Sequence, residues 1–383
     1  MNRLLCILTL LSWSIAILPA QDIKIGIQDT LYSDLLKEDR PIKIFLPASY
    51  AKYSSVPYPV TYVLDGDFLF PAISGMVEYM SKTGQLPEMI LVCISNTSRT
   101  RDFTPTHSIL NYEGDTAKYL QASGGGPEFL SFLNKELIPY INQNYRTNSY
   151  NSIVGRSFGG LIAGYDFLQS NSQLNSYLLI DPSFWWDDQW VIQQVKSKTI
   201  NSANKRLYLS CSDNFKYSDY INQMRISQEA YYLKLKEAGM PPSKLKIDYF
   251  EEDTHGTVTI PSLHKGLLFL FDGYYLEGMK YKKAGEIIEH FTTFKQSRQA
   301  EFPPLEGMIN WLASLQEKAE DSHKLYQLNA QNFPESLNVQ FKLAQSFEKL
   351  EQTDKAVLLY QNILKEDKGH QASKERLKIL KEK

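Results

Sequence analysis

Residues Gly155 to Gly159 read Gly-Arg-Ser-Phe-Gly, so a serine stands two positions from a glycine on either side. The apolar run before them is typical of a strand, and the small residues after them are typical of a helix. This G-x-S-x-G spacing indicates a nucleophile elbow, a sharp strand-to-helix turn that holds a serine hydroxyl clear of the backbone. About one chain in ten of this length contains the bare pattern by chance. Ser157 is therefore a candidate nucleophile that other residues must support.

A serine hydroxyl needs an adjacent base, and the base needs a third group to orient it. In folds that contain a nucleophile elbow, the three residues occur along the chain in the order serine, acid, histidine. Of the six histidines, His255 is the predicted base, because it lies in a loop directly after the strand pattern 245–253. Asp213, at the end of the strand pattern 206–213, is the preferred acid. Asp219 and Asp181 are its rivals.

The oxyanion formed on attack requires two preorganised N–H donors. The backbone of Phe158, which follows the candidate nucleophile, is expected to supply one. The strand pattern 58–66 ends at Gly66, where the backbone can approach closely. The second donor is expected to be the N–H of Asp67, with Gly66 as the alternative.

Four side chains near these positions are candidate substrate contacts. Trp185 and Trp186 offer flat walls suited to sugar faces or aromatic acyl groups, although tryptophans at this point can equally pack the base of a loop. Arg156 places a positive charge beside the elbow. Arg99 could bind an anionic group or pair with Asp102.

Strand patterns alternate with helical ones between about 22 and 272. The strand runs occupy 41–47, 58–66, 88–95, 152–155, 176–181, 206–213 and 245–253. Several of them are apolar on consecutive residues, as in strands that are buried on both faces. A long helical pattern, 127–145, lies among them. The sequence therefore predicts the α/β class, with a mostly parallel sheet covered by helices on both faces and an all-α extension after it.

The chain divides into three predicted parts. Residues 1–20 combine a basic start, an apolar run and a small residue before Gln21, which predicts a cleaved signal peptide and export to the periplasm or medium. Residues 21–275 carry the sheet and the candidate site. Residues 276–383 are helical, and 334–367 are similar to a tetratricopeptide helix pair. Such a tail could bind a protein partner or cap the catalytic domain.

Composition excludes several classes of function. The formal net charge is -2 and no basic run stands out, so nucleic acid is not an expected partner. The apolar N-terminal run is too short to span a membrane comfortably, and no transmembrane segment is expected after its removal. No metal-ligand spacing of Cys and His occurs, and no cofactor is expected. Cys93 and Cys211 both lie in strand patterns, where buried thiols are common, and a disulfide between them stays open.

Seven segments together resemble the esterase D-like putative esterases, a family of α/β-hydrolases that includes enterobactin-type siderophore esterases. They span most of residues 40–260: "RPIKIFLPASY", "PVTYVLDGDFLF", "RTRDFTPT", "GGGPEFLSFLNKELIPYINQNYRT", "GRSFGGLIAGYDFL", "DPSFWWDD" and "DTHG". The helical tail also resembles tails of some exported members.

The resemblance implies a serine carboxylic ester hydrolase with Ser157 as nucleophile and His255 as base, acting on a small-molecule or glycan ester. The acid is its weakest match. Two positions depart from the family pattern: Arg156 stands where histidine is common, and Asp181 precedes Pro182 where a small residue is usual. A catalytically inactive binding protein that works through its tail, and an acyltransferase on the same fold, are the alternatives.

Overall fold

The computed structural model describes residues 23–196, 205–213 and 222–382. The predicted signal peptide and Asp219 lie outside these ranges. Seven strands fall where the sequence predicts them, and an eighth, β1, precedes them. Their bounds are β1 (Ile27–Ser33), β2 (Glu38–Phe45), β3 (Tyr58–Val63), β4 (Ile90–Ile94), β5 (Thr147–Arg156), β6 (Ser176–Ile180), β7 (Arg206–Ser212) and β8 (Leu245–Phe250).

These strands form one sheet in the order β1-β2-β4-β3-β5-β6-β7-β8. From β4 to β8 every neighbouring pair is parallel, and only the β1–β2 and β2–β4 pairs are antiparallel. The residues of β3, β4, β6 and β7 are buried throughout, and β5 is buried from Tyr150 to Gly155. The α/β-hydrolase-like fold expected from the sequence is confirmed.

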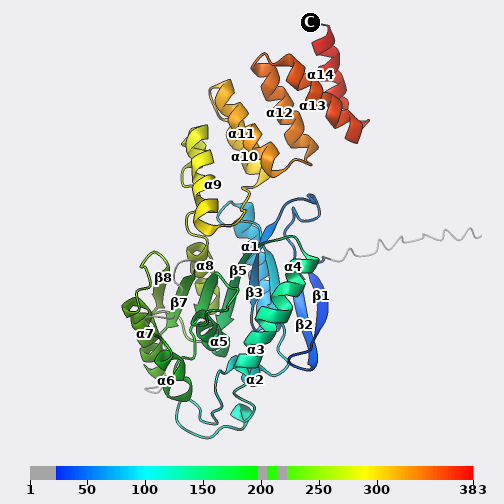
Figure 1. Cartoon of the computed structure of the whole chain (residues 1–383). Helices are drawn as coiled ribbons and strands as arrows, with labels where there is room; N and C mark the ends of the chain where they lie inside the picture. The colour runs from blue at the N-terminus through cyan, green and yellow to red at the C-terminus, as the bar shows by residue number, and fades with distance from the viewer. Residues whose placement is uncertain (1–22, 197–204, 214–221, 383) are drawn as a thin grey trace, which may run out of the picture.

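Helices cover both faces of the sheet (Figure 1). One buried cluster joins the sheet to α3 (Gly126–Phe132), α4 (Ile138–Asn144), α5 (Phe158–Phe167), α6 (Trp186–Gln193) and α7 (Asn222–Glu237). A second cluster joins the other face to α1 (Gly66–Lys82) and α8 (Thr259–Leu270). The helical pattern 127–145 is confirmed, and a five-residue π-helical stretch, Leu133–Leu137, connects α3 with α4. Cys93 and Cys211 are buried free thiols, and burial raises the pKa of both.

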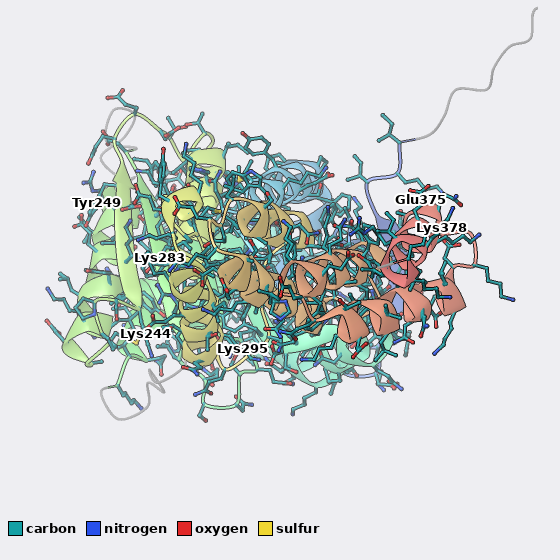
Figure 2. The ribbon with its side chains drawn as sticks, turned by 90° about the horizontal axis from the view of Figure 1, so that it is seen from above. Lys244, Tyr249, Lys283, Lys295, Glu375 and Lys378 are labelled. Carbon is teal, nitrogen blue, oxygen red and sulfur yellow. The ribbon has the colours of Figure 1, made fainter. Side chains whose placement is uncertain are left out.

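The C-terminal extension is all-α, as predicted, and consists of α9 (Ala284–Arg298), α10 (Glu306–Ser314), α11 (Ala319–Asn332), α12 (Leu337–Lys349), α13 (Thr353–Glu366) and α14 (Gln371–Lys381). The expected helix pair at 334–367 falls on α12 and α13. In Figure 2 the extension runs from α9, with Lys283 just before its first residue and Lys295 in its last turn, to α14, which carries Glu375 and Lys378. α14 lies on the side of the view away from Tyr249 of β8. No helix within the described ranges is long and apolar enough to cross a membrane.

The two ends of the sheet differ in what lies beyond them. The short helix α2 (Arg99–Phe103), α6 and the loop between α2 and α3 lie at one end in Figure 1, and the helical extension lies at the other. Because α2, α5 and α6 follow β4, β5 and β6 directly, the first end is the carboxyl end of the parallel strands. Reactive groups gather at this end in open α/β sheets.

Candidate active site

Ser157 joins β5 to α5 with φ 56° and ψ -119°, a backbone conformation that non-glycine residues rarely adopt. Such strain is expected at an elbow. A Cβ atom on Gly155 would lie 2.2 Å from the carbonyl oxygen of Gly159. The turn is therefore too tight for a side chain at Gly155, which explains the glycine of the motif.

Ser183, which sequence analysis did not single out, contacts the candidate nucleophile. The two hydroxyl oxygens, Oγ of Ser157 and Oγ of Ser183, are 3.1 Å apart, and the Ser183 N–H donates to the Ser157 carbonyl at 3.1 Å. Ser183 is therefore a direct neighbour of the candidate nucleophile through both its hydroxyl and its backbone.

His255 contacts a buried carboxylate. Its Nδ1 lies 2.7 Å from Oδ2 of Asp181, and the Asp181 side chain is only 1% exposed. Asp181 also accepts hydrogen bonds from the Ser212 backbone N–H at 3.0 Å and hydroxyl at 2.6 Å, and from Nε2 of Gln228 at 2.9 Å. Burial alone would raise the pKa of Asp181, but the contacts of His255 and Ser212 outweigh it and hold that pKa below its ordinary value. The carboxylate form of Asp181 is thus favoured, and it faces the imidazole.

The structure favours Asp181 over Asp213, the acid preferred from the sequence. Asp181 directly follows β6, the strand next to β5 of Ser157, whereas Asp213 follows β7, one strand further away. The backbone N–H of Asp213 donates to the carbonyl oxygens of Phe250 and Asp253, at 3.2 and 2.9 Å. Asp213 therefore ties β7 to the turn after β8, while the carboxylate on Nδ1 of His255 is that of Asp181.

The predicted oxyanion donors lie at the first turns of two helices. Phe158 is the first residue of α5, and Gly66 and Asp67 are the first two of α1. These helices follow β5 and β3, which are parallel neighbours paired through Val63 and Val154. First-turn N–H groups have no partner within their own helix, and a helix N-terminus favours a negative charge. A Cβ on Gly66 would lie within 2.7 Å of the backbone of Cys93 and Ile94, so only glycine allows α1 to begin here.

The side chain of Asp67 is engaged by other residues and does not contribute an oxyanion donor. Its Oδ1 lies 2.8 Å from Nζ of Lys43 and accepts a hydrogen bond from Ser95 at 2.9 Å. The hydrogen bond from Lys43 lowers the pKa of Asp67. The candidate oxyanion donor at Asp67 is therefore its backbone N–H and not its side chain.

Arg99 is paired, but not with Asp102. Its Nε and Nη2 donate to the two oxygens of Asp65 at 2.6 and 2.9 Å, and Nη2 also lies 3.3 Å from the Arg156 carbonyl oxygen. Asp102 is instead held by Arg40 at 2.7 Å and Arg101 at 2.8 Å. Arg99 thus bridges the residue before the Gly66–Asp67 donors and the residue before Ser157.

The two tryptophans differ in accessibility. Trp186 is fully buried, and its indole N–H donates to Oγ1 of Thr106 at 3.0 Å, so its ring packs within the protein and presents no face to solvent. Trp185 is half-buried, with ring centroids 5.9 Å from Phe158 and 5.8 Å from Tyr112. Tyr112 is 40% exposed. Trp185 and Tyr112 therefore form the accessible part of this aromatic cluster.

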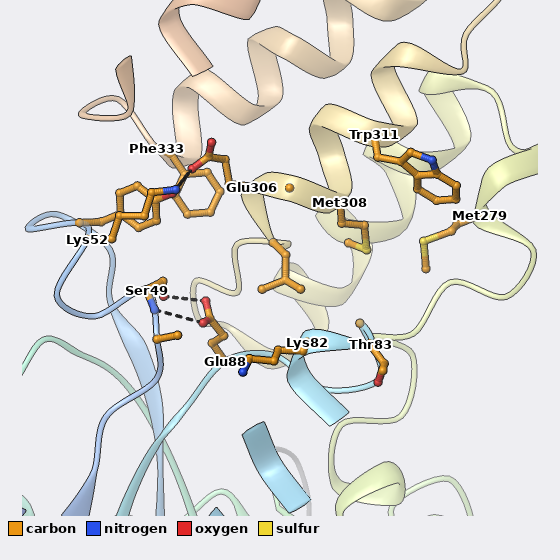
Figure 3. A pocket seen from close by; sticks show the side chains of 15 residues that line it. Ser49, Lys52, Lys82, Thr83, Glu88, Met279, Glu306, Met308, Trp311 and Phe333 are labelled. Atoms are coloured by element: carbon orange, nitrogen blue, oxygen red, sulfur yellow. Dashed lines mark hydrogen bonds and ion pairs between the residues drawn. The ribbon is translucent and has the colours of Figure 1, made fainter. Parts of the chain in front are cut away.

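A cavity of about 600 Å³ lies elsewhere, between the α/β domain and the extension (Figure 3). Ser49, hydrogen-bonded to Glu88, lies on one side of it, and Met308 and Trp311 of α10 lie on the other. Thr83 and Gly84 line it directly after α1, which has 17 residues and is thus about 25 Å long. The cavity is therefore about that far from the candidate oxyanion donors and is not part of this site.

A mostly parallel eight-stranded sheet covered on both faces, with a serine on a strained turn at the carboxyl end of a central strand, defines the α/β-hydrolase class of fold. Comparison with known proteins supports an esterase within that class. Residues 33–214 match the family model described as "Putative esterase".

Three relatives illustrate the likeness. A siderophore enterobactin esterase of Emericella nidulans is 25% identical over 245 residues, which cover 55% of this chain and 80% of that protein. The crystal structure of an IroE-like serine hydrolase from Shewanella oneidensis is 28% identical, with a TM-score of 0.69 over 80% of this chain and 99% of the other. An uncharacterised protein from Capnocytophaga ochracea shares the fold over 94% of this chain and 100% of its own, at 18% identity and a TM-score of 0.61.

Proposed function

We propose that this chain is an exported serine carboxylic ester hydrolase that acts through an acyl-serine intermediate. The observation that carries the proposal is the 2.7 Å contact between Nδ1 of His255 and buried Asp181, at the same end of the sheet as the strained turn at Ser157. An imidazole oriented by a carboxylate is the base that an elbow serine requires.

In the proposed reaction Nε2 of His255 takes the proton of the Ser157 hydroxyl as Oγ attacks the ester carbonyl. Asp181 stabilises the imidazolium. The N–H groups of Phe158 and of Asp67 or Gly66 stabilise the oxyanion. The imidazolium then protonates the leaving alcohol as the ester bond breaks. In the second half, a water molecule deprotonated by His255 attacks the acyl carbonyl, the bond to Ser157 Oγ breaks, and Oγ takes the proton back from the imidazolium as the acid leaves.

For the substrate we propose a siderophore-type or carbohydrate ester. The relative from Emericella nidulans is described as a siderophore enterobactin esterase, and the accessible cluster of Trp185 and Tyr112 suits a flat aromatic or sugar group. We propose further that residues 1–20 direct export. For the pair α12 and α13 we propose a tetratricopeptide-like unit that is open to a protein partner.

Labelling with a fluorophosphonate probe tests the nucleophile without knowledge of the substrate. We expect the mature chain to be labelled, and Ser157→Ala and His255→Ala to lose labelling while they keep the wild-type melting temperature. His264→Ala is the matched control, because His264 is exposed on α8, and it should label normally. A folded wild type that does not react would favour the binding-protein alternative.

If the serine reacts with the probe, hydrolysis is then measured on a panel of esters: a catecholate trilactone, an acetylated polysaccharide and simple acyl esters. If product forms only when an acceptor alcohol is added, and not with water alone, the protein is an acyltransferase and the hydrolase proposal is wrong.

A further inference from the structure

Arg156, the last residue of β5, places a half-buried guanidinium directly before the nucleophile. Its Nη2 donates to the backbone carbonyl oxygen of His255. Its Nε is buried without a hydrogen-bond partner, and within the described ranges no carboxylate lies within 4 Å of the guanidinium as an ion pair. The principal contact of this cation is therefore the backbone of the candidate base.

The loop that carries His255 must reach back across the sheet. It follows β8, which is separated from β5 by β6 and β7. Neighbouring strands lie about 4.8 Å apart, so three spacings place the end of β8 about 14 Å from the end of β5. A loop that continued straight on from β8 would leave the imidazole too far from Ser157 to act on it.

Two contacts hold His255 toward the serine side of the sheet. Asp181, at the end of β6, contacts Nδ1 and orients the ring. Arg156, at the end of β5, contacts the carbonyl oxygen and holds the backbone. The salt bridge of Glu251 in the same loop goes instead to Arg225 of α7, at 3.0 Å, on the β8 side. The ring of His255 is thus held from the end of β6, and its backbone is held from the end of β5.

We infer that Arg156 is a positioning residue, which holds the His255 loop within reach of Ser157, rather than a substrate contact. The inference rests on the proposed roles of Ser157 and His255. Because a displacement of about 1 Å in a catalytic group can cost about a hundredfold in rate, loss of the Arg156 hydrogen bond should act on the chemical step and leave substrate binding nearly unchanged.

The test is Arg156→Met, which keeps most of the aliphatic stem and removes the donor and the charge. We would measure kcat and KM for a neutral ester, p-nitrophenyl acetate, and an anionic one, p-nitrophenyl hemisuccinate, together with the rate of fluorophosphonate labelling. We expect kcat and the labelling rate to fall by about ten- to a hundredfold, with both KM values within about twofold of wild type. A rise in KM for the anionic ester alone would make Arg156 a substrate contact and overturn the inference.

Two further variants separate position from charge and from folding. Arg156→Lys keeps a cation and a donor and should recover part of the lost kcat. Arg225→Gln, the matched control, removes another arginine that contacts the same loop, and should keep kcat within about twofold of wild type. If Arg156→Met does not fold, Arg156→Leu, which also lacks a donor and a charge, replaces it with the same expectations.

The outcomes distinguish the two levels of the argument. A wild-type chain that is not labelled contradicts the proposed function itself. A labelled wild type with Arg156→Met reacting at the same rate contradicts only the positioning role.

Discussion

Asp181 is the residue on which the candidate base depends. It accepts hydrogen bonds from Ser212 and Gln228 and faces Nδ1 of His255, so an amide in its place would lose the charge and favour the wrong imidazole tautomer. We expect Asp181→Asn to fold and to lose about 10³- to 10⁴-fold in kcat on p-nitrophenyl acetate. Asp213→Asn should stay within about threefold of wild type. The reverse pattern would return the acid to Asp213.

Residue types and spacing identified the candidate nucleophile, base and acids of this site, but they did not predict which of these side chains contact one another. The elbow pattern singles out Ser157, and chain order singles out His255. The choice among acids depends on how far the loop after β8 reaches back over the sheet, which no local pattern records. Similarly, Arg99 pairs with Asp65 because Arg40 of β2 occupies Asp102, a contact between segments more than 60 residues apart.

At the scale of elements, a network of charged side chains fixes α2 to β2. Arg40 and Asp102, both fully buried, lie 2.7 Å apart, and Glu38 accepts hydrogen bonds from Arg101 at 2.6 and 3.0 Å and from Arg40 at 2.8 Å. α2 also carries Arg99, which contacts the loop of the candidate oxyanion donors. The network therefore fixes the position of Arg99 relative to the sheet.

This network predicts a pH-dependent stability. The hydrogen bond from Arg101 is the main cause that lowers the pKa of Glu38 from its ordinary value of 4.5 to about 2. Because the folded-state pKa is the lower one, ionised Glu38 stabilises the fold above about pH 4.5, and this stabilisation is lost as pH falls toward 2. Glu38→Gln should cost about 1 kcal/mol of unfolding free energy at pH 7, since Glu38 is partly exposed.

Melting curves of wild type and Glu38→Gln at pH 7, 5 and 3 check this. The gap between the two melting temperatures should be largest at pH 7 and should shrink by pH 3. A gap that is constant over this range would mean that the carboxylate charge does not contribute.

Strand-like runs predicted seven of the eight strands, and the consecutive apolar residues of β4 and β6 are typical of strands that are buried on both faces. They did not predict β1. This strand lies at the edge of the sheet, four of its seven residues are polar, and most of its side chains are exposed or partly exposed. The pairing of β1 with β2 fixes it as a strand, and such pairing is not visible in the local sequence.

At the scale of the whole molecule, the helices of the C-terminal extension fall into two groups that pack differently against the α/β domain. Apolar side chains of α9, α10 and α11 belong to the same buried cluster as α1 and α8 of the α/β domain; they include Ile287, Phe291, Phe294, Ile309, Leu312 and Leu325. α12 contributes Val339 to the buried cluster of the sheet and α3 to α7, and α12 to α14 also have a small cluster of their own around Tyr360. The first part of the extension is thus a cap, and the second part is attached through Val339 and through its neighbouring helices.

Two truncations test this division. A chain ending at residue 335 lacks α12 to α14 but keeps Phe333, which packs on Tyr53 with ring centroids 4.8 Å apart; it should stay soluble and cleave esters at the wild-type kcat. A chain ending at residue 275 exposes the face of α1 and α8 that α9 to α11 cover. Each large apolar side chain lost from that cluster costs about 1.5–3 kcal/mol, so this chain should unfold or aggregate. Solubility, melting temperature and kcat decide the question. A stable, active chain of 275 residues would show that the whole extension is dispensable to the fold, whereas loss of activity at 335 would extend the cap to α12.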